Sequence, residues 1–520
     1  MVPPTDAAYA DIDRLVELGA VDSIIIGQRP YSRREIARIA RVTREKFSQS
    51  TSGMGATSAL VSGLLARLED RFGNAMEPSD GVSFVPLDAA SAFVSTTNAP
   101  RRGPSVFNST LLQATIEPLG RRRPGVQLPR GQAAGVELGH RLDVASWLSV
   151  QASERFESRR PEDSTVSSSA AEVLTLFARA RYRNLAVSAG REEFAWSQHV
   201  GDGLFLASDA PALDQLSLAS DRPFALPGFL RHAGPVMGTI ILADLGPSAD
   251  HSYSRLLTYK LSMQPTDGVE LGGTFLDHFG GRGARQSSFT DRVIDFLPFI
   301  DIFRRHNYAD TTRQLDVESD KLLGIDGRWR IRRLGGTTIS GEWLIDDFDV
   351  HRLGALLTTV GSQYLNVMVP LGDDPSWTAR ISAKHMGIST YTHSGLRDGI
   401  STRGRLLGDE LGPDAKSFAG ALRWTPGAES TLELEYRRAV YSSAVYDQFY
   451  SDASMTYDVV RKVSKDPDET RDRVLVSIVT SPDALWSLQL RAGAELTENF
   501  AFSGGRRRAY VADVVIRFAQ

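Results

Sequence analysis

The sequence has no cysteine, so the chain forms no disulfide and offers no thiolate as nucleophile or metal ligand. It also has no apolar run of about 18 residues, which excludes a transmembrane helix. A transmembrane β-barrel stays possible, because barrel strands are only half apolar. The chain also lacks a large excess of either charge, since it has 59 basic and 63 acidic residues. A nucleic-acid partner bound through bulk positive charge is therefore not expected.

Targeting and catalytic motifs are also missing. The apolar run Ile24–Ile26 is too short for the core of a secretory signal. We therefore expect either a cytosolic protein or a precursor whose signal was removed or missed. The motifs H-E-x-x-H, G-x-S-x-G and G-x-x-x-x-G-K-[ST] do not occur. The expected protein is not an enzyme and uses no cofactor.

Two polar groupings leave narrower alternatives open. His199, Asp202 and Ser208 could bring a serine and a histidine to the rim of a barrel, as a barrel phospholipase requires. A second grouping could offer oxygen ligands to a hard cation such as calcium. It consists of Asp346, Asp347 and Asp349. Polar loop residues and a solvated strand end are the simpler interpretations, so no metal is expected.

Residues 1–75 show the 3.6-residue period of amphipathic helices. Ser32 and Glu35 form an S-x-x-E capping box, and further helical patterns lie on either side of it. Three short helices would form an N-terminal bundle that acts as a plug or docking domain. We predict that residues 76–104 are a linker and that residues 105–520 form a separate, larger domain.

From about residue 105 the apolar period changes to 2, which is typical of strands. In 484–496 one face holds Trp486, Leu488, Leu490, Ala492 and Ala494, and the other holds Ser487, Gln489, Arg491 and Glu495. The polar faces of nearly all candidate strands carry Arg, Glu or Asp, whereas the apolar faces are often aliphatic with an aromatic near one end. This pattern indicates lipid outside, a polar lumen inside and aromatic girdles at the interfaces.

We predict about eighteen strands, an even number as in bacterial single-chain barrels. They are 105–118, 131–139, 142–153, 171–183, 184–196, 213–220, 236–245, 253–264, 268–277, 321–333, 337–348, 353–369, 376–388, 417–425, 430–441, 471–481, 484–496 and 507–518. In the second half, short turns such as Leu334–Gly336 alternate with long links such as 278–320. Outer-membrane barrels show this alternation of periplasmic turns and external loops. The predicted fold is an all-β, transmembrane antiparallel barrel of the outer membrane over residues 105–520, with a small N-terminal α-helical bundle at residues 1–75.

Six segments follow one another in a recognisable order: Tyr9–Gly19, Gly27–Arg38, Gly190–Trp196, Leu204–Pro211, Ser220–Phe224 and Gly341–Asp347. Together they resemble the capsule assembly protein Wzi family, over nearly the whole chain. The resemblance implies an eighteen-stranded outer-membrane barrel with its helical bundle on the periplasmic side. It also implies a lectin that holds capsular polysaccharide at the cell surface.

Long links between the predicted strands combine aromatic rings with charged and amide side chains. Sugars stack their C–H faces on rings and pair their hydroxyls with carboxylates, amides and guanidinium groups. The external face is therefore the predicted glycan site, although each ring could instead pack a loop over the barrel mouth. The candidate glycan-binding residues are Phe303, Arg304, Tyr308, Tyr391, His393, Tyr446, Phe449 and Tyr450.

Arginines on the polar faces are predicted to point into the lumen. They include Arg179, Arg181, Arg328, Arg330 and Arg380. With inward glutamates they could form ion pairs that close the pore, which is the simpler interpretation, or line a path for anionic solutes.

These patterns leave two principal functions open. The first is a non-catalytic surface lectin that binds and retains capsular or exopolysaccharide, and the alternative is an outer-membrane porin or solute channel. A third, weaker possibility makes residues 9–38 a wall anchor similar to an S-layer-homology motif. The expected partners are polysaccharide, outer-membrane lipid and polysaccharide-export machinery, and the expected state is a monomer.

Overall fold

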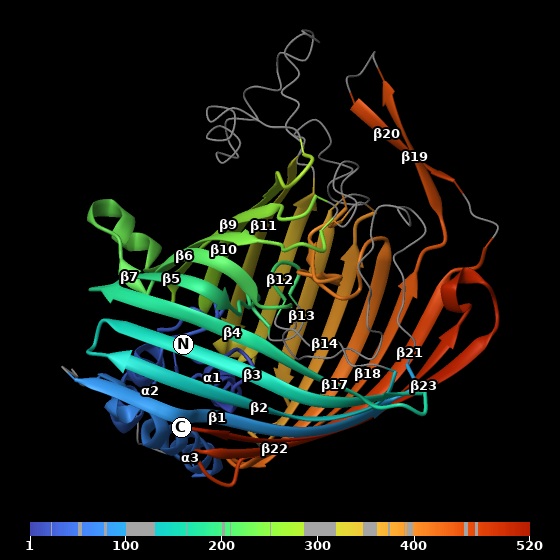
Figure 1. The fold of residues 1–520 in the computed structure, drawn as a ribbon. Coiled ribbons are helices and arrows are strands. Elements are labelled where there is room, and N and C mark those ends of the chain that lie inside the picture. The colour runs from blue at the N-terminus through green and yellow to red at the C-terminus, as the bar shows by residue number, and fades with distance from the viewer. Residues whose placement is uncertain are drawn as a thin grey trace.

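The computed structural model shows a closed barrel with helices at one end (Figure 1). It describes residues 1–21, 23–49, 55–76, 81–99, 130–162, 164–199, 203–207, 210–249, 251–284, 319–346, 361–372, 375–388, 390–392, 399–451, 456–462 and 466–520. For residues 445–451 and 456–462 the description covers the backbone alone.

The described helices are α1 (Ala7–Glu17), α2 (Arg33–Gln49), α3 (Gly55–Phe72), and the 3₁₀ turns η1 (Gly73–Met76), η3 (Gly228–Ala233), η6 (Arg332–Leu334) and η8 (Phe500–Phe502). The strands of the main sheet are β1 (Val82–Thr97), β2 (Gly131–Val144), β3 (Leu148–Pro161), β4 (Ser168–Tyr182), β5 (Leu185–Glu192), β6 (Leu213–Ser220), β7 (Phe224–Ala225), β8 (Pro235–Asp244), β9 (Arg255–Thr266), β10 (Val269–Phe279), β11 (Ser319–Ile331), β12 (Thr337–Asp346), β13 (Ser362–Pro370), β14 (Trp377–Met386), β17 (Ala415–Gly427), β18 (Ser430–Tyr441), β21 (Glu469–Thr480), β22 (Trp486–Glu498) and β23 (Arg506–Ala519). Two hairpins lie outside this sheet: β15 (Ser401–Thr402) with β16 (Arg405–Leu406), and β19 (Val445–Ser451) with β20 (Thr456–Lys462).

The three α-helices form the predicted bundle. Asp6 caps α1, because its Oδ1 accepts a hydrogen bond from the Ala8 N–H at 2.9 Å. Ser32 caps α2 through a 3.1 Å bond from the Glu35 N–H to its Oγ, as the capping box predicts. The apolar faces of the helices then pack into one buried cluster. Among the described residues, no helix is long and apolar enough to cross a membrane.

The main sheet contains 19 strands, of which the two-residue β7 adds only to β8 and the other eighteen close the barrel. Each neighbouring pair of these eighteen is antiparallel, and β1 pairs with β23 from Ala89–Ala519 to Thr97–Val511. Closure gives the backbone groups of both end strands a partner, which a membrane interior cannot supply. The predicted count and fold class are therefore confirmed.

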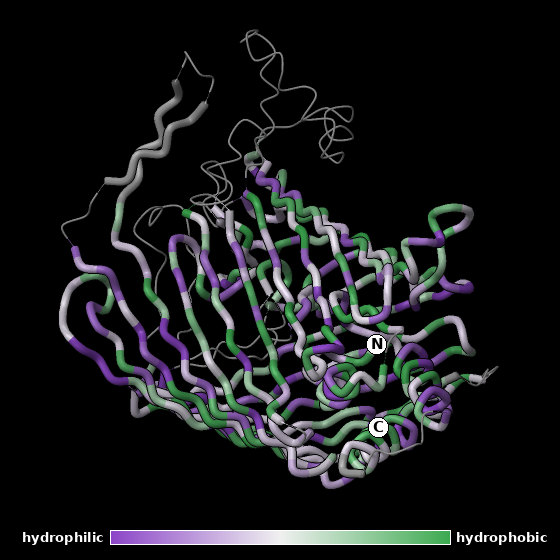
Figure 2. Tube along the Cα trace, turned by 180° about the vertical axis from the view of Figure 1, so that it is seen from behind, coloured by the Kyte–Doolittle hydropathy of each residue, from purple (hydrophilic) through white to green (hydrophobic). Residues whose placement is uncertain are grey.

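Side chains along the wall alternate between lumen and lipid, and Figure 2 shows polar and apolar residues interleaved along the strands. On β11, Arg328 is 6% exposed and its neighbour Trp329 is 55% exposed. On β18, Glu435 is 5% exposed and Leu434 is 48% exposed. The apolar residues thus face outwards, the reverse of a soluble barrel.

One of the predicted boundaries changes. The predicted linker 76–104 contains β1, so that prediction is wrong and the barrel wall begins at Val82. The alternation of β1 is weak because small residues dominate it, and its register slips between Val85 and Ala89, next to Pro86. The predicted strand 105–118 lies outside the described residues.

Link lengths distinguish the two ends of the barrel. Short turns lie at the end that carries α1, α2 and α3, which we call the periplasmic end. Longer links lie at the opposite, external end, where the β19–β20 hairpin projects beyond the wall (Figure 1). The long link between β18 and β21 that was predicted from the sequence supplies this hairpin.

The alternation gives a first test. We expect Leu434→Arg to lower the free energy of unfolding by about 2–4 kcal/mol, because it puts a charge into lipid near mid-strand. Ser477→Arg is the matched control, since Ser477 pairs with the inward-facing Glu433 on the neighbouring strand. Urea unfolding in lipid vesicles measures both variants. Equal losses would contradict the assignment of the two faces.

Candidate functional site

The segment between α1 and α2 enters the barrel and runs along the inner faces of β8, β9 and β10. We call residues 24–31 the lumen segment. The N–H groups of Ile26 and Gly27 each donate to the carboxylate of Glu270 at 2.8 Å. Gln28 Nε2 donates to the Met237 carbonyl of β8 and to Ser262 Oγ of β9, both at 2.9 Å. The barrel wall therefore supplies the hydrogen-bond partners that this irregular backbone lacks in itself.

A buried ionic network holds the lumen segment in place. Lys260 Nζ lies 2.6 Å from Asp326 Oδ2, and neither side chain is exposed. Gln198 Nε2 donates both to Asp326 at 2.6 Å and to Glu270 at 2.9 Å. Arg328 lies 3.5 Å from Glu270 and adds a second cation. Buried charges are costly unless they are paired and hydrogen-bonded, and here each carboxylate has such partners.

Two links from the external end also fold into the lumen. Their apolar side chains pack with inward wall residues into one buried cluster, which includes Trp196, Leu204, Phe205, Leu206, Ile400, Leu406, Leu407 and Leu411. Glu342 anchors the first link, because it accepts from Ser197 Oγ at 2.5 Å and from the Leu204 N–H at 2.7 Å. The described part of the lumen is thus filled by the chain itself.

Tyr391 joins the two infolded links. Its hydroxyl donates to the Leu204 carbonyl and accepts from the Asp409 N–H, while its own N–H donates to Asp346 at 2.9 Å. Its ring lies against Gly408, where an added Cβ would come within 2.3 Å of the ring. The side chain is 1% exposed, so the ring offers no face to a sugar in this structure.

The helical bundle closes the periplasmic end through contacts with the wall. Arg14 Nη1 donates to Thr378 Oγ1 at 3.0 Å, and Arg330 Nε donates to the Glu17 carbonyl at 3.1 Å. Arg423 forms an ion pair with the Glu17 carboxylate. Helix α1 is therefore attached to β11, β14 and β17.

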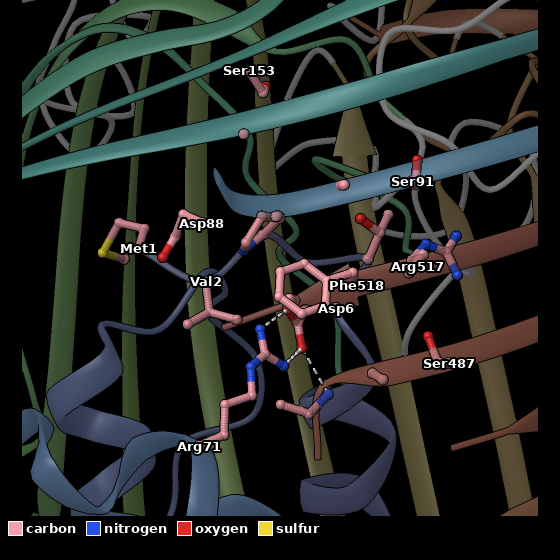
Figure 3. A pocket seen from close by; sticks show the side chains of 18 of the residues that line it. Met1, Val2, Asp6, Arg71, Asp88, Ser91, Ser153, Ser487, Arg517 and Phe518 are labelled. Atoms are coloured by element: carbon pink, nitrogen blue, oxygen red, sulfur yellow. Dashed lines mark hydrogen bonds and ion pairs between the residues drawn. The ribbon is translucent and has the colours of Figure 1, made fainter. Parts of the chain in front are cut away.

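A cavity of about 180 Å³ separates another part of the bundle from the wall (Figure 3). On the bundle side, both oxygens of Asp6 lie 2.6 Å from Arg71. Burial alone would raise the pKa of Asp6, but the attraction and hydrogen bonds of Arg71 hold it below its usual value. On the wall side, Arg517 donates to Gln489 at 3.1 Å. Bundle and wall also interact directly across this cavity, because Arg33 of α2 lies 4.0 Å from Asp88 of β1.

The five predicted lumen arginines occupy inward positions, and each has a protein partner. Arg179 lies 3.2 Å from Asp221, Arg328 3.5 Å from Glu270 and Arg380 2.6 Å from Glu435, while Arg330 contacts Glu17 and Arg181 donates to the Ser146 carbonyl. Three of these arginines form ion pairs, whereas Arg181 and Arg330 donate to backbone carbonyls. That the arginines close the pore stays a prediction.

The predicted glycan residues fall into three groups. Phe303, Arg304, Tyr308 and His393 lie outside the described residues, and Tyr391 is buried as described above. Tyr446, Phe449 and Tyr450 belong to β19, whose register pairs Tyr446 with Arg461 and Tyr450 with Tyr457. Their glycan-binding role stays a prediction.

The structure describes only part of the two polar groupings that the sequence suggested as a phospholipase site and as a cation site. His199 Nε2 lies 3.0 Å from Arg380 Nη1 inside the lumen, while Asp202 and Ser208 lie outside the described residues. Asp346 accepts from Tyr391, and Asp347 and Asp349 lie outside the description as well. Within the described part of the chain, no three His, Asp or Glu side chains are grouped to hold a metal ion.

Sequence reasoning missed the centre of the ionic network. Lys260 and Glu270 occupy inward positions of two predicted strands, so the alternation could have indicated them. Gln198 lies in an irregular link and carries no local signal. Only the folded chain shows that these three residues meet.

Comparison with known proteins places this geometry in a family. The profile of the family described as "Capsule assembly protein Wzi" matches residues 110–509, more than half of the chain. The chain belongs to this family. The resemblance that the sequence motifs indicated is therefore confirmed.

The family has a solved member that is similar in fold over the whole chain. It is the Escherichia coli Wzi protein, described as an outer-membrane protein involved in group 1 capsule assembly and as a carbohydrate-binding β-barrel. The TM-score is 0.66 at 14% identity, with 100% of this chain and 99% of that chain covered. This likeness shows the fold of an outer-membrane barrel.

Weaker likenesses extend to other barrels. Pseudomonas aeruginosa OccD3 (OpdP) covers 85% of this chain and 92% of its own, at 9% identity and a TM-score of 0.44. OccD1 (OprD) covers 85% and 97%, at 8% identity and a TM-score of 0.45. These scores carry no functional argument. No curated protein matches the sequence significantly.

The lumen segment gives a second test. Glu270→Gln replaces one acceptor oxygen by an NH₂ group that faces other donors, so we expect a loss of about 2–4 kcal/mol in stability and easier release of the N-terminal bundle. Limited proteolysis of the bundle and thermal unfolding of the purified barrel measure the change.

The matched control is Glu433→Gln, because Glu433 is also inward, but in the described part of the chain its carboxylate has Arg380 as its one ion-pair partner, at 3.4 Å. It should change stability by less than the first variant. Protection of the bundle at the wild-type level in Glu270→Gln would contradict the anchoring role of Glu270.

Proposed function

We propose that the protein binds and retains capsular or extracellular polysaccharide at the cell surface, without catalysis. The observation that carries this proposal is the filled lumen: the lumen segment and the infolded links occupy the space that a solute would use. The external end is left as the surface on which a polymer can bind. Membership of a capsule assembly family, and the carbohydrate binding ascribed to the E. coli member, support the choice of polysaccharide.

The β19–β20 hairpin is the external element best suited to a glycan. Residues opposite one another in an antiparallel pair share a face, so the register puts Tyr446, Tyr450, Tyr457 and Arg461 at positions on one face of the hairpin. Phe449 occupies a position on the other face. A row of rings with a guanidinium group is the combination that stacks on sugars and pairs with their hydroxyls.

Each contact of this kind is weak, at about 0.5–1.5 kcal/mol. A short oligosaccharide should therefore bind poorly to a single copy of the protein. A long polymer that reaches several copies gains from the high effective concentration of its repeats. Retention then depends on the density of the protein in the membrane. A contact with polysaccharide-export machinery and a monomeric state stay predictions.

Conductance separates this proposal from the porin alternative. We expect the purified protein to be almost silent in planar bilayers, because buried side chains and paired charges occupy its lumen. A general porin reconstituted in the same way is the control for insertion. Stable, large conductance steps from the wild-type protein would support the channel and contradict the proposal that the lumen does not conduct.

Loss of the aromatic row tests the lectin directly. We expect Tyr446, Tyr450 and Tyr457 changed together to Ala to shed polysaccharide into the medium while the barrel stays in the membrane. At about 1 kcal/mol per ring, the affinity of one copy falls by about 100-fold. Surface and released polysaccharide are measured at matched protein abundance.

Tyr182→Ala is the control, because Tyr182 is an exposed ring at the periplasmic end. It should retain polymer normally. Wild-type retention by the triple variant would exclude this hairpin face and direct attention to the other predicted residues, Phe303 and Tyr308 among them.

A further inference from the structure

The lipid-facing wall is grooved where β1 meets β23. Two neighbouring rows of cross-strand partners line the groove, across six strands from β21 to β3. One row is Val476, Ala492, Ala512, Thr96, Gln132 and Arg160, and the other is Ile478, Leu490, Val514, Val94, Ala134 and Ser158. Because directly paired residues share a face, each row is a continuous strip on the outside of the barrel.

Small side chains make the floor of this groove. Ala492 and Ala512 pair with each other on the first row, and Ala134 lies on the second row. Their neighbours on the other row are larger: Leu490, Val514 and Gln132. Tyr510 borders one side and Ile516 the other, each nearly half exposed. Outward-facing alanines between taller side chains leave a trough in a surface that would otherwise be convex.

The two ends of the groove differ in polarity and in depth. Ile478 lies two residues from the periplasmic end of β21, where the groove is apolar. Arg160 lies one residue from the external end of β3, beside Ser158 and Gln132. The groove thus runs from the external rim into the apolar band, as an acyl chain does below its headgroup.

Arg160 is the charged group at the external end. It is exposed, and no ion pair joins it to another residue in the described part of the chain. The adjacent Glu162 is paired with Arg130 instead. Arg438, another outward arginine of the external rim, is 3.5 Å from Asp472. Arg160 therefore keeps its guanidinium fork available for an external anion, and this fork matches a phosphate.

The groove has a volume of about 710 Å³, within the range of about 300–1,000 Å³ typical of ligand pockets. We expect its occupant to be a molecule of the membrane, since the groove lies on the lipid-facing wall and exposed apolar side chains line it, among them Val94, Val476 and Val514. An apolar trough with one cation at the external end is complementary to an acyl chain that carries a negative headgroup in the external leaflet.

We propose that this groove binds one phosphorylated glycolipid of the external leaflet. One acyl chain lies along the alanine floor, and a phosphate contacts Arg160. The proposal concerns the outer wall and does not depend on the polysaccharide role. The lipid would stay bound at the β1–β23 seam when the barrel is extracted from the membrane.

The experiment measures bound lipid on the full-length protein extracted from outer membranes in mild detergent. Native mass spectrometry counts and identifies the retained lipid, and purified bisphosphorylated lipid A is then titrated onto delipidated protein. We expect about one bound glycolipid on the wild type. Arg160→Gln should weaken binding of lipid A by about tenfold, because one charge-assisted contact is lost.

Ala512→Phe should abolish retention by filling the trough, and Ala492→Leu is the second filling variant if the first does not fold. Lys416→Gln removes an exposed basic residue near the external end of β17, and Ala383→Phe adds a ring to the lipid face of β14, so both serve as matched controls. Both controls should keep wild-type binding.

Three results would overturn the proposal. Retention of lipid A at the wild-type level in Arg160→Gln and in a folded groove-filling variant would show that the groove is not its site. Equal losses in the controls would show a general effect on the detergent-solubilised barrel. Retention of phospholipid in place of lipid A would show that the occupant is not the external glycolipid.

Discussion

The pairing of β1 with β23 is the contact on which the rest of the structure depends. A membrane interior offers no water to an unpaired strand edge, so the eighteen-stranded wall is stable in lipid only when its first and last strands meet. Once the wall is closed, the pleat of each strand decides which residues face lipid and which face the lumen. The same seam carries the small residues of the lipid groove.

Closure creates a lumen lined with charged residues, and the chain fills it with its own segments. Glu270 receives two backbone N–H groups of the lumen segment, and the Lys260–Asp326 pair lies beside it without solvent contact. The infolded external links add an apolar layer around Tyr391. A wall with polar inner faces is therefore combined with a compact interior.

Local patterns predicted most of the wall. The strand limits of β6 and β18 agree with the predicted 213–220 and 430–441, because alternation and turn residues are properties of neighbouring positions. Strand β1 was missed, since Pro86 and a run of small residues weaken its alternation. The site was predicted less well: the lumen arginines follow from strand parity, but Tyr391 was expected on the surface and is buried.

The sequence by itself determined the period of each element, the two-sided character of the strands and the family signature. These depend on residues within a few positions of one another, so they can be read before folding. Only the tertiary structure decided what fills the lumen. Gly27 and Glu270 are separated by 243 positions, and Gln198 meets both Glu270 and Asp326 from an irregular link. Such contacts are fixed by closure of the barrel, which no local pattern contains.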